Sequence, residues 1–192
     1  MRKPVNIAIL ASGKGSNADQ LCRHFRNHTE ITVKLIISNK SEAGVLEVAA
    51  RNNIHSQVIH NHRLESELLE VLRSASIDFV VLAGFLRKVP DDVVEHFKNR
   101  MVNIHPALLP KFGGKGMYGS YVHSAVLAAG EKSSGITIHF VTGNYDEGNI
   151  VFQTECPVEE NDTAESLADK IHALEHRYYP EVIEKLILNT QA

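Results

Sequence analysis

The sequence is poor in the residues and segments that mark several classes of protein. It has no tryptophan and only two cysteines, Cys22 and Cys156, among 192 residues. These lie far apart and fit no metal-binding spacing, so we expect buried free thiols and no disulfide. The apolar run after Met1 is too short for a signal peptide and lacks a small-residue cleavage site, and no run approaches the roughly 20 residues of a membrane-spanning helix. The sequence therefore predicts a cytoplasmic protein with no membrane partner.

An excess of charge of one sign is also missing. Lys and Arg number 20 against 23 Asp and Glu, which gives a net charge of -3. A nucleic-acid-binding surface usually shows itself as an excess of basic residues, so this composition disfavours a nucleic-acid partner. We expect small-molecule substrates, and either a monomer or a homodimer.

Apolar and amphipathic segments alternate along the first hundred residues. A mostly apolar run at residues 5–11 is typical of a central strand buried on both faces of a parallel sheet, and residues 31–37 and 78–83 are predicted to be further strands. Segments with apolar residues at helical spacing separate them, for example residues 64–74. The alternation predicts an α/β fold: a Rossmann-like, doubly wound, mostly parallel sheet with helices on both faces.

The pattern changes after residue 100. Residues 136–141 and 150–155 are rich in β-branched and apolar side chains and flank a Gly/Asn/Asp turn, which predicts an antiparallel C-terminal strand pair. Residues 163–188 have a helical pattern that we expect Pro180 to break in two. Without repeats or a clear linker, the chain is predicted to be one domain over residues 1–192. Its first half, 1–100, is of nucleotide-binding type, and 101–192 is an added half.

A glycine-rich turn, SGKGSN at residues 12–17, follows the first predicted strand and precedes a helix. This order directs backbone N–H groups and a helix N-terminus at an anion. Gly13, Gly15 and Ala18 also satisfy a dinucleotide pattern, but the acidic residue which that pattern requires is absent from residues 38–40. We therefore favour a phosphate monoester. The alternative is a turn that needs glycine only for its backbone conformation.

Asn103 and His105 lie two residues apart on a predicted strand that Pro106 ends. Side chains two apart on a strand point the same way, so the amide and the imidazole share a face. Both can donate to one oxygen, which suits the stabilisation of a developing oxyanion. A single histidine on a strand is more often a structural hydrogen-bonding group. The neighbouring amide and the position at a strand end favour a catalytic interpretation.

Asp146 lies in a glycine-bounded turn at residues 143–148, where an acidic residue usually serves the turn itself. If the turn folds over His105, the carboxylate would raise the pKa of the imidazole and favour the form that donates to an oxyanion. The 11 histidines raise the possibility of a metal site. His172 and His176 are four residues apart, but no third ligand is identifiable, so we expect no metal.

Five segments together resemble the folate-dependent phosphoribosylglycinamide formyltransferases. They are GKGSN at 13–17, LAGFLR at 82–87, NIHPALLP at 103–110, GITIHFV at 135–141 and DEG at 146–148. The NIHPALLP string is highly specific for enzymes that use formyl-tetrahydrofolate, and the resemblance runs nearly end to end. It implies the formyltransferase fold and transfer of a formyl group from 10-formyltetrahydrofolate to the amine of N1-(5-phospho-D-ribosyl)glycinamide, in de novo purine biosynthesis.

The resemblance also implies roles for individual residues. Asn103, His105 and Asp146 would be the catalytic set, acting without a metal. The phosphate and ribose of the substrate would be bound by Gly15, Ser16, Asn17 and Glu175. The folate pocket would include Asn103 and Asp146 together with Arg63, Leu86, Arg87, Lys88, Val89 and Thr142, and residues 142–146 would close over the pterin. The second half of the chain would thus be catalytic and folate-binding.

The sequence departs from the family pattern in an insert from Gly113 to Gly119. The insert is longer than in many relatives, and we expect it to alter the substrate mouth. Two functions share the expected triad, 10-formyltetrahydrofolate hydrolase and methionyl-tRNA formyltransferase, but each is expected to carry a further domain for which 192 residues leave no room. A non-catalytic nucleotide-binding module would explain the glycine turn and leave Asn103 and His105 unexplained.

Overall fold

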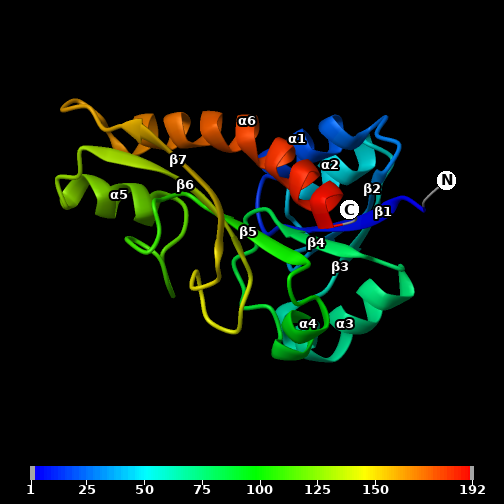
Figure 1. The fold of residues 1–192 in the computed structure, drawn as a ribbon. Coiled ribbons are helices and arrows are strands. Elements are labelled where there is room, and N and C mark those ends of the chain that lie inside the picture. The colour runs from blue at the N-terminus through cyan, green and yellow to red at the C-terminus, as the bar shows by residue number, and fades with distance from the viewer. Residues whose placement is uncertain (1–2, 191–192) are drawn as a thin grey trace.

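The computed structural model describes residues 3–190 and shows a seven-stranded sheet with the strand order β3-β2-β1-β4-β5-β6-β7. The strands are β1 (Val5–Leu10), β2 (Ile31–Ser38), β3 (His55–Val58), β4 (Phe79–Leu82), β5 (Met101–His105), β6 (Ser133–Phe140) and β7 (Ile150–Pro157). The helices are α1 (Ser16–Phe25), α2 (Val45–Arg51), the 3-10 turn η1 (Asn61–Arg63), α3 (Leu64–Ser74), α4 (Asp91–His96), α5 (Ser120–Ala128) and α6 (Ala164–Thr190). Figure 1 shows the arrangement.

The first five strands run parallel to one another. Strand β6 pairs antiparallel with β5, and β7 pairs antiparallel with β6. The predicted α/β class, the mostly parallel sheet and the antiparallel C-terminal pair are confirmed. The chain leaves β1 toward β2 on one side and later returns to β4 on the other side of β1. In open sheets of this kind, ligands bind beyond the carboxyl ends of the strands where the order reverses. The fold thus points to the ends of β1 and β4 as the place for a site.

Two apolar clusters cover the two faces of the sheet. Alternate residues of β1 belong to opposite clusters, with Ile7 and Ile9 in one and Ala8 and Leu10 in the other. The first cluster includes buried residues of α1, α2, α5 and α6, and the second includes those of α3 and α4. Figure 1 shows α1, α2 and α6 on one side of the sheet and α3 and α4 on the other. Burial on both faces explains why β1 and β4 are mostly apolar in sequence.

The expected break at Pro180 is wrong. The helix α6 continues from Ala164 to Thr190 with Pro180 inside it. A proline in a helix loses its N–H and crowds the preceding turn. Here Pro180 is itself buried, and the side chains of Tyr179, Ile183 and Ile187 are buried with it along α6. The packing of this apolar face against the sheet outweighs the local cost of the proline.

Tyr179 links α6 to the edge of the sheet where β4 ends. Its side chain is fully buried, and its hydroxyl donates to the carbonyl oxygen of Leu82 over 2.8 Å. We expect Tyr179→Phe to lower the free energy of unfolding by about 1–3 kcal/mol, because the buried hydrogen bond is lost. Urea denaturation measures this, with Tyr178→Phe as the control that changes stability by less than about 0.5 kcal/mol. Equal stabilities of the Tyr179→Phe variant and the unmodified protein would contradict the assignment.

The structure also tests the prediction that both cysteines are buried free thiols. Cys22 and Cys156 are both free, as expected, although only Cys22 is fully buried and Cys156 is half-buried. Burial raises the pKa of the Cys22 thiol to about 12, so the thiolate is disfavoured there.

Within residues 3–190, no helix combines the length and the apolar character that crossing a membrane requires.

Candidate active site

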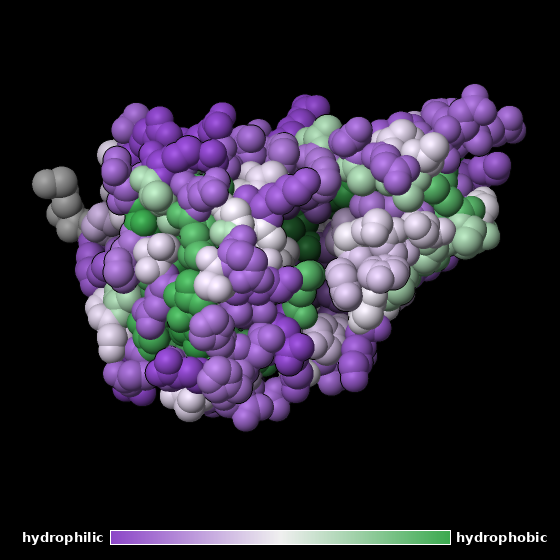
Figure 2. Space-filling model, turned by 180° about the vertical axis from the view of Figure 1, so that it is seen from behind, coloured by the Kyte–Doolittle hydropathy of each residue, from purple (hydrophilic) through white to green (hydrophobic). Residues whose placement is uncertain are grey.

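A cavity of about 690 Å³ lies beyond the carboxyl ends of β1, β4 and β5. Its wall is formed by the glycine turn after β1, the segment after β4, the end of β5, the insert before α5, the turn between β6 and β7, and one face of α6. Figure 2 shows the molecule hollowed between its larger body and the lobe that contains α5, with apolar residues visible in the recess. Segments from both halves of the chain therefore meet around one space.

The glycine turn carries the chain from β1 into α1 at one end of this cavity. Gly15 precedes the first turn of α1 with φ of 81°, a left-handed conformation that favours glycine. A Cβ atom at this position would lie 2.8 Å from the Cα of Val45. The first N–H groups of α1 have no partner within the helix, and Gly13 to Asn17 all line the cavity. The turn has the geometry expected of an anion site.

Replacing Gly15 by alanine tests this geometry. Because the left-handed conformation and the contact with Val45 both penalise a side chain, we expect the free energy of unfolding to fall by about 1–3 kcal/mol. The matched control is Gly13→Ala, since no atom lies within 4 Å of a Cβ at Gly13. Urea unfolding curves should separate the two variants. The account of the turn would be wrong if both variants were as stable as the unmodified protein.

Asn17 and Glu175 connect α1 to α6 beside the turn. The Asn17 side-chain amide donates to Glu175 Oε2 over 2.9 Å, and both residues line the cavity. Glu175 is only 6% exposed, and this burial raises the pKa of its carboxyl group. The Oδ1 atom of Asn17 is buried and has no partner among residues 3–190. The structure therefore brings together all four residues expected at the phosphate and ribose end.

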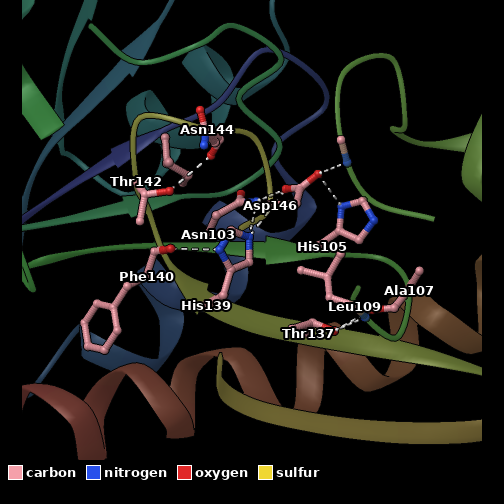
Figure 3. A network of polar contacts seen from close by, with 12 residues as sticks. Asn103, His105, Ala107, Leu109, Thr137, His139, Phe140, Thr142, Asn144 and Asp146 are labelled. Carbon is pink, nitrogen blue, oxygen red and sulfur yellow. Dashed lines mark hydrogen bonds and ion pairs between the residues drawn. The ribbon is translucent and has the colours of Figure 1, made fainter. Parts of the chain in front are cut away.

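Asp146 lies at the centre of a polar network at the other side of the cavity (Figure 3). One oxygen, Oδ2, lies 3.5 Å from Nδ1 of His105 and accepts the N–H of Gly114 over 2.9 Å. The other, Oδ1, lies 3.5 Å from the amide nitrogen of Asn103 and 3.5 Å from Nε2 of His139. Although burial opposes ionisation, contacts with His139, His105 and Gly114 outweigh it and lower the pKa of Asp146. Asn103, His105 and Asp146 thus converge.

The imidazole of His105 is held at both nitrogens. Its Nε2 lies 2.8 Å from the carbonyl oxygen of Phe112, so Nε2 carries a proton, and Nδ1 faces Asp146. The expected rise in the pKa of His105 is wrong in its net direction. Burial lowers the pKa below the usual value, and the Asp146 carboxylate and the Phe112 carbonyl oppose this only in part. The sequence predicted the charge of the neighbour but not the depth of burial.

His139 is a member of the network that the sequence reasoning did not single out. Its Nδ1 lies 2.8 Å from the Phe140 carbonyl oxygen, which places a proton there, and its Nε2 lies 3.1 Å from the Asn103 amide nitrogen. His139 is paired with Asn103 across β5 and β6. It therefore fixes the orientation of the Asn103 amide. The strand register is the signal that could have identified His139, because a histidine opposite Asn103 on an adjacent strand must lie beside it.

Most of the residues expected in the folate pocket line the cavity. These are Leu86, Arg87, Lys88, Val89, Asn103, Thr142 and Asp146. Arg63 is the exception, because it belongs to η1, does not line the cavity and forms an ion pair with Glu67. The segment at Leu86 is anchored by its N–H, which donates to the buried hydroxyl of Ser12 over 3.0 Å. The glycine turn and this segment are thereby fixed to each other.

The insert before α5 forms part of the wall as well. Gly114 to Gly119 line the cavity, and the backbone of Phe112 and Gly114 contacts His105 and Asp146. The insert therefore reaches the polar network as well as the mouth. Within residues 3–190, no group of three or more His, Cys, Asp or Glu side chains is arranged to hold a metal ion.

Comparison with known proteins finds relatives over nearly the whole chain. The family described as formyl transferase matches residues 5–183. Phosphoribosylglycinamide formyltransferase from Bacillus subtilis is 32% identical over 188 residues, which cover 94% of each chain. The chloroplastic enzyme of the same name from Arabidopsis thaliana is 42% identical over 187 residues, or 92% of this chain. The chain spans 63% of the length of that plant protein and 60% of its counterpart from Vigna unguiculata.

Solved structures show the same similarity in three dimensions. Phosphoribosylglycinamide formyltransferase from Bacillus halodurans superposes with a TM-score of 0.87 at 35% identity, covering 95% of each chain. The protein of that name from Anaplasma phagocytophilum superposes with a TM-score of 0.86 at 37% identity, covering 95% of this chain and 86% of the other. The similarity therefore extends over nearly the whole fold.

Proposed function

The chain belongs to the formyl transferase family, and from this premise we propose that it transfers the formyl group of 10-formyltetrahydrofolate to the amine of N1-(5-phospho-D-ribosyl)glycinamide. The products are the N-formyl compound and tetrahydrofolate, in a step of de novo purine (IMP) biosynthesis. The observation that carries the proposal is the convergence of Asn103, His105 and Asp146 at a cavity that also contains the anion-binding turn. One cavity thus offers an oxyanion site and a phosphate site.

In the proposed reaction the neutral amine attacks the formyl carbon directly. A C–N bond forms, and the carbonyl electrons move onto the oxygen, which becomes negatively charged. Asn103 donates to that oxygen and the positive charge of protonated His105 stabilises it, and such interactions are worth most in a water-poor site. The intermediate then collapses by breaking the bond to N10 of the folate, which takes up a proton as the amine nitrogen loses one. No covalent enzyme intermediate is needed.

Asp146 supports this role of His105 electrostatically. Since Nε2 donates to Phe112, Nδ1 is the nitrogen that gains or loses a proton beside the carboxylate. The lowered pKa of Asp146 keeps it ionised at neutral pH. Negative charge that develops on the substrate oxygen adds to this field and favours the imidazolium. Asp146 can then pass the proton of the amine to solvent through a water molecule.

The two substrates are proposed to occupy opposite parts of the cavity. Gly15, Ser16, Asn17 and Glu175 would bind the phosphate and ribose, and the folate would lie against residues 86–89, Thr142 and Asp146. Arg63 remains a proposed contact for the part of the folate that extends beyond the cavity. Accordingly, residues 1–192 would act as one domain, with phosphate binding in 1–100 and catalytic and folate-binding groups in 101–192. We propose a cytoplasmic enzyme with small-molecule partners, as a monomer or a homodimer.

A single assay tests the function. The protein is incubated with 10-formyltetrahydrofolate and the glycinamide ribonucleotide, the folate absorbance is followed, and the formylated product is quantified. We expect folate conversion to require the ribonucleotide and to match product formation one to one. Loss of formyl at the same rate without the acceptor would identify a hydrolase. Absence of any folate conversion would favour the non-catalytic nucleotide-binding module.

A further inference from the structure

A chain of hydrogen-bonded polar groups crosses the carboxyl ends of the first strands of the sheet. The N–H of Leu86, which follows β4, donates to the Ser12 hydroxyl over 3.0 Å, and that hydroxyl donates to Oδ1 of Asn39 over 2.6 Å. The side-chain amide of Asn39 donates in turn to Oδ1 of Asn61 over 2.8 Å. Ser12 follows β1, Asn39 follows β2 and Asn61 begins η1. We call this chain, from Leu86 to Asn61, the relay.

The main chain of residues 85–89 depends on the relay for its position. These residues line the cavity and form neither helix nor strand. Within the part of the chain that the structure describes, the N–H of Leu86 makes the only hydrogen bond of this main chain. The glycine turn is held differently, since the N–H of Val45 donates to the carbonyl oxygen of Gly13 over 3.1 Å. A displaced Ser12 hydroxyl would therefore release residues 85–89 and leave the glycine turn in place.

Asn39 is the buried centre of the relay. It is only 4% exposed, and both polar atoms of its side chain are paired, Oδ1 with Ser12 and Nδ2 with Asn61. A buried amide is costly to the fold unless it is fully hydrogen-bonded, and an apolar side chain would fill the position without that cost. Because the Ser12 hydroxyl accepts from Leu86, its own proton is free to point at Asn39. Hydrogen bonds aligned in one direction strengthen one another, so Asn39 fixes the hydroxyl on which Leu86 depends.

The far end of the relay reaches the element that carries Arg63. Asn61 is the first residue of η1, is exposed, and makes no other side-chain hydrogen bond within residues 3–190. Arg63 is the last residue of η1 and pairs with Glu67. The relay therefore joins residues 86–89 to η1, and both were assigned to the folate above.

We propose that Asn39 is a positioning residue for folate binding. Through Ser12 it places the main chain at Leu86, and through Asn61 it holds η1 in a fixed position relative to that segment. Asn39 does not line the cavity, so it acts on the ligand only through these neighbours. The identity of the ligand rests on the proposed function. Because the main-chain bonds of the glycine turn do not involve the Asn39 side chain, its loss weakens binding of the folate and spares the ribonucleotide.

Calorimetry with tetrahydrofolate in the absence of oxygen tests the proposal without the reaction. We expect Asn39→Ala to raise the Kd for tetrahydrofolate about tenfold, because binding must then order residues 85–89. The Kd for the glycinamide ribonucleotide should stay within about twofold of the unmodified value. Asn61→Ala breaks only the far bond of the relay and should raise the tetrahydrofolate Kd about threefold.

Asn52→Ala is the matched control for the loss of a hydrogen-bonded amide. Asn52 is half-buried, donates to the carbonyl oxygen of Val48 over 2.9 Å and accepts from Arg26 over 3.0 Å, yet it does not line the cavity. Its replacement should leave the Kd for tetrahydrofolate within about twofold of the unmodified value.

A double-mutant cycle separates positioning from a general loss of structure. If Asn39 acts through the Ser12 hydroxyl, Asn39→Ala should raise the Kd by no more than about threefold in a Ser12→Ala background, the part transmitted through Asn61. An effect of about tenfold in both backgrounds would show that the two residues act independently, and it would overturn the relay.

The outcomes separate this proposal from the proposed function. Formyl transfer by the unmodified protein, with unchanged tetrahydrofolate affinity in Asn39→Ala, overturns the relay and leaves the function in place. Weaker tetrahydrofolate binding with unchanged ribonucleotide binding supports the relay even if formyl transfer is absent. An equal rise in both Kd values overturns it. If Asn39→Ala does not fold, the exposed Asn61→Ala variant decides, and an unchanged tetrahydrofolate Kd there overturns the proposal.

Discussion

Replacing His105 by alanine is expected to lower kcat for formyl transfer by about 10²–10³-fold, the usual cost of removing one donor from an oxyanion site. The KM values should change much less, because His105 is assigned to the oxygen of the transition state and not to either substrate end. Steady-state kinetics with both substrates measure the effect. The change removes the imidazole that is assigned to the reacting oxygen and that faces Asp146 through Nδ1.

Two controls exclude misfolding and a nonspecific effect of removing a histidine as causes of a lower kcat. His105 is 3% exposed, so the variant must be shown to melt as the unmodified protein does before its kcat is interpreted. His62→Ala removes an exposed histidine of η1 that does not line the cavity, and its kcat should be unchanged. Near-normal turnover by a folded His105→Ala variant would exclude His105 from the chemistry.

Replacing Asp146 by asparagine is the second change with a large expected effect. The amide keeps the shape of the carboxylate but loses the charge beside His105, and we expect kcat to fall by about 10²–10³-fold. The sign of the pH effect follows from the contacts. Asp146 favours the imidazolium, so its removal lowers the pKa of His105 further, and activity that requires the imidazolium shifts to lower pH. The pH profile of kcat measures the shift.

Glu147→Gln is the matched control for Asp146. Glu147 adjoins Asp146, but its carboxylate is exposed and accepts from the Asn144 side chain over 2.7 Å. Its replacement should leave both kcat and the pH profile unchanged. A folded Asp146→Asn variant with an unaltered pH profile would show that the carboxylate does not act through His105.

The fold could be predicted from the sequence because each layer has a local signature. Residues 5–11 are apolar except for Asn6 because β1 is buried on both faces, and the apolar residues of 64–74 recur at helical spacing because α3 covers one face. The failure at Pro180 has the opposite cause. The proline rule is local, whereas the burial of Tyr179 and its neighbours against the sheet is a tertiary effect.

The site was only partly predictable for a related reason. Asn103 and His105 share a face through the period of a strand, which the sequence contains. Contacts of Asp146 with them depend on how the turn between β6 and β7 returns over β5. Gly148 shows this dependence, because any Cβ there would collide with the carbonyl oxygen of Phe140. The glycine of the DEG segment therefore allows the turn to pack against β6 and carry Asp146 inward.

Other features depend on burial and register, which no short motif records. The pKa of His105 follows from its depth in the protein and from the Phe112 carbonyl, and neither is visible in the residues around it. The position of His139 in the polar network follows from its pairing with Asn103 across β5 and β6.

The most direct measurement of the central claim is the single-turnover rate of formyl transfer by the Asn103→Ala/His105→Ala double variant, with saturating concentrations of both substrates. If the two side chains stabilise one oxyanion, the rate falls by at least about 10²-fold. Equilibrium dialysis should at the same time show nearly unchanged affinity for the ribonucleotide. A folded double variant that transfers the formyl group at close to the unmodified rate would contradict the account.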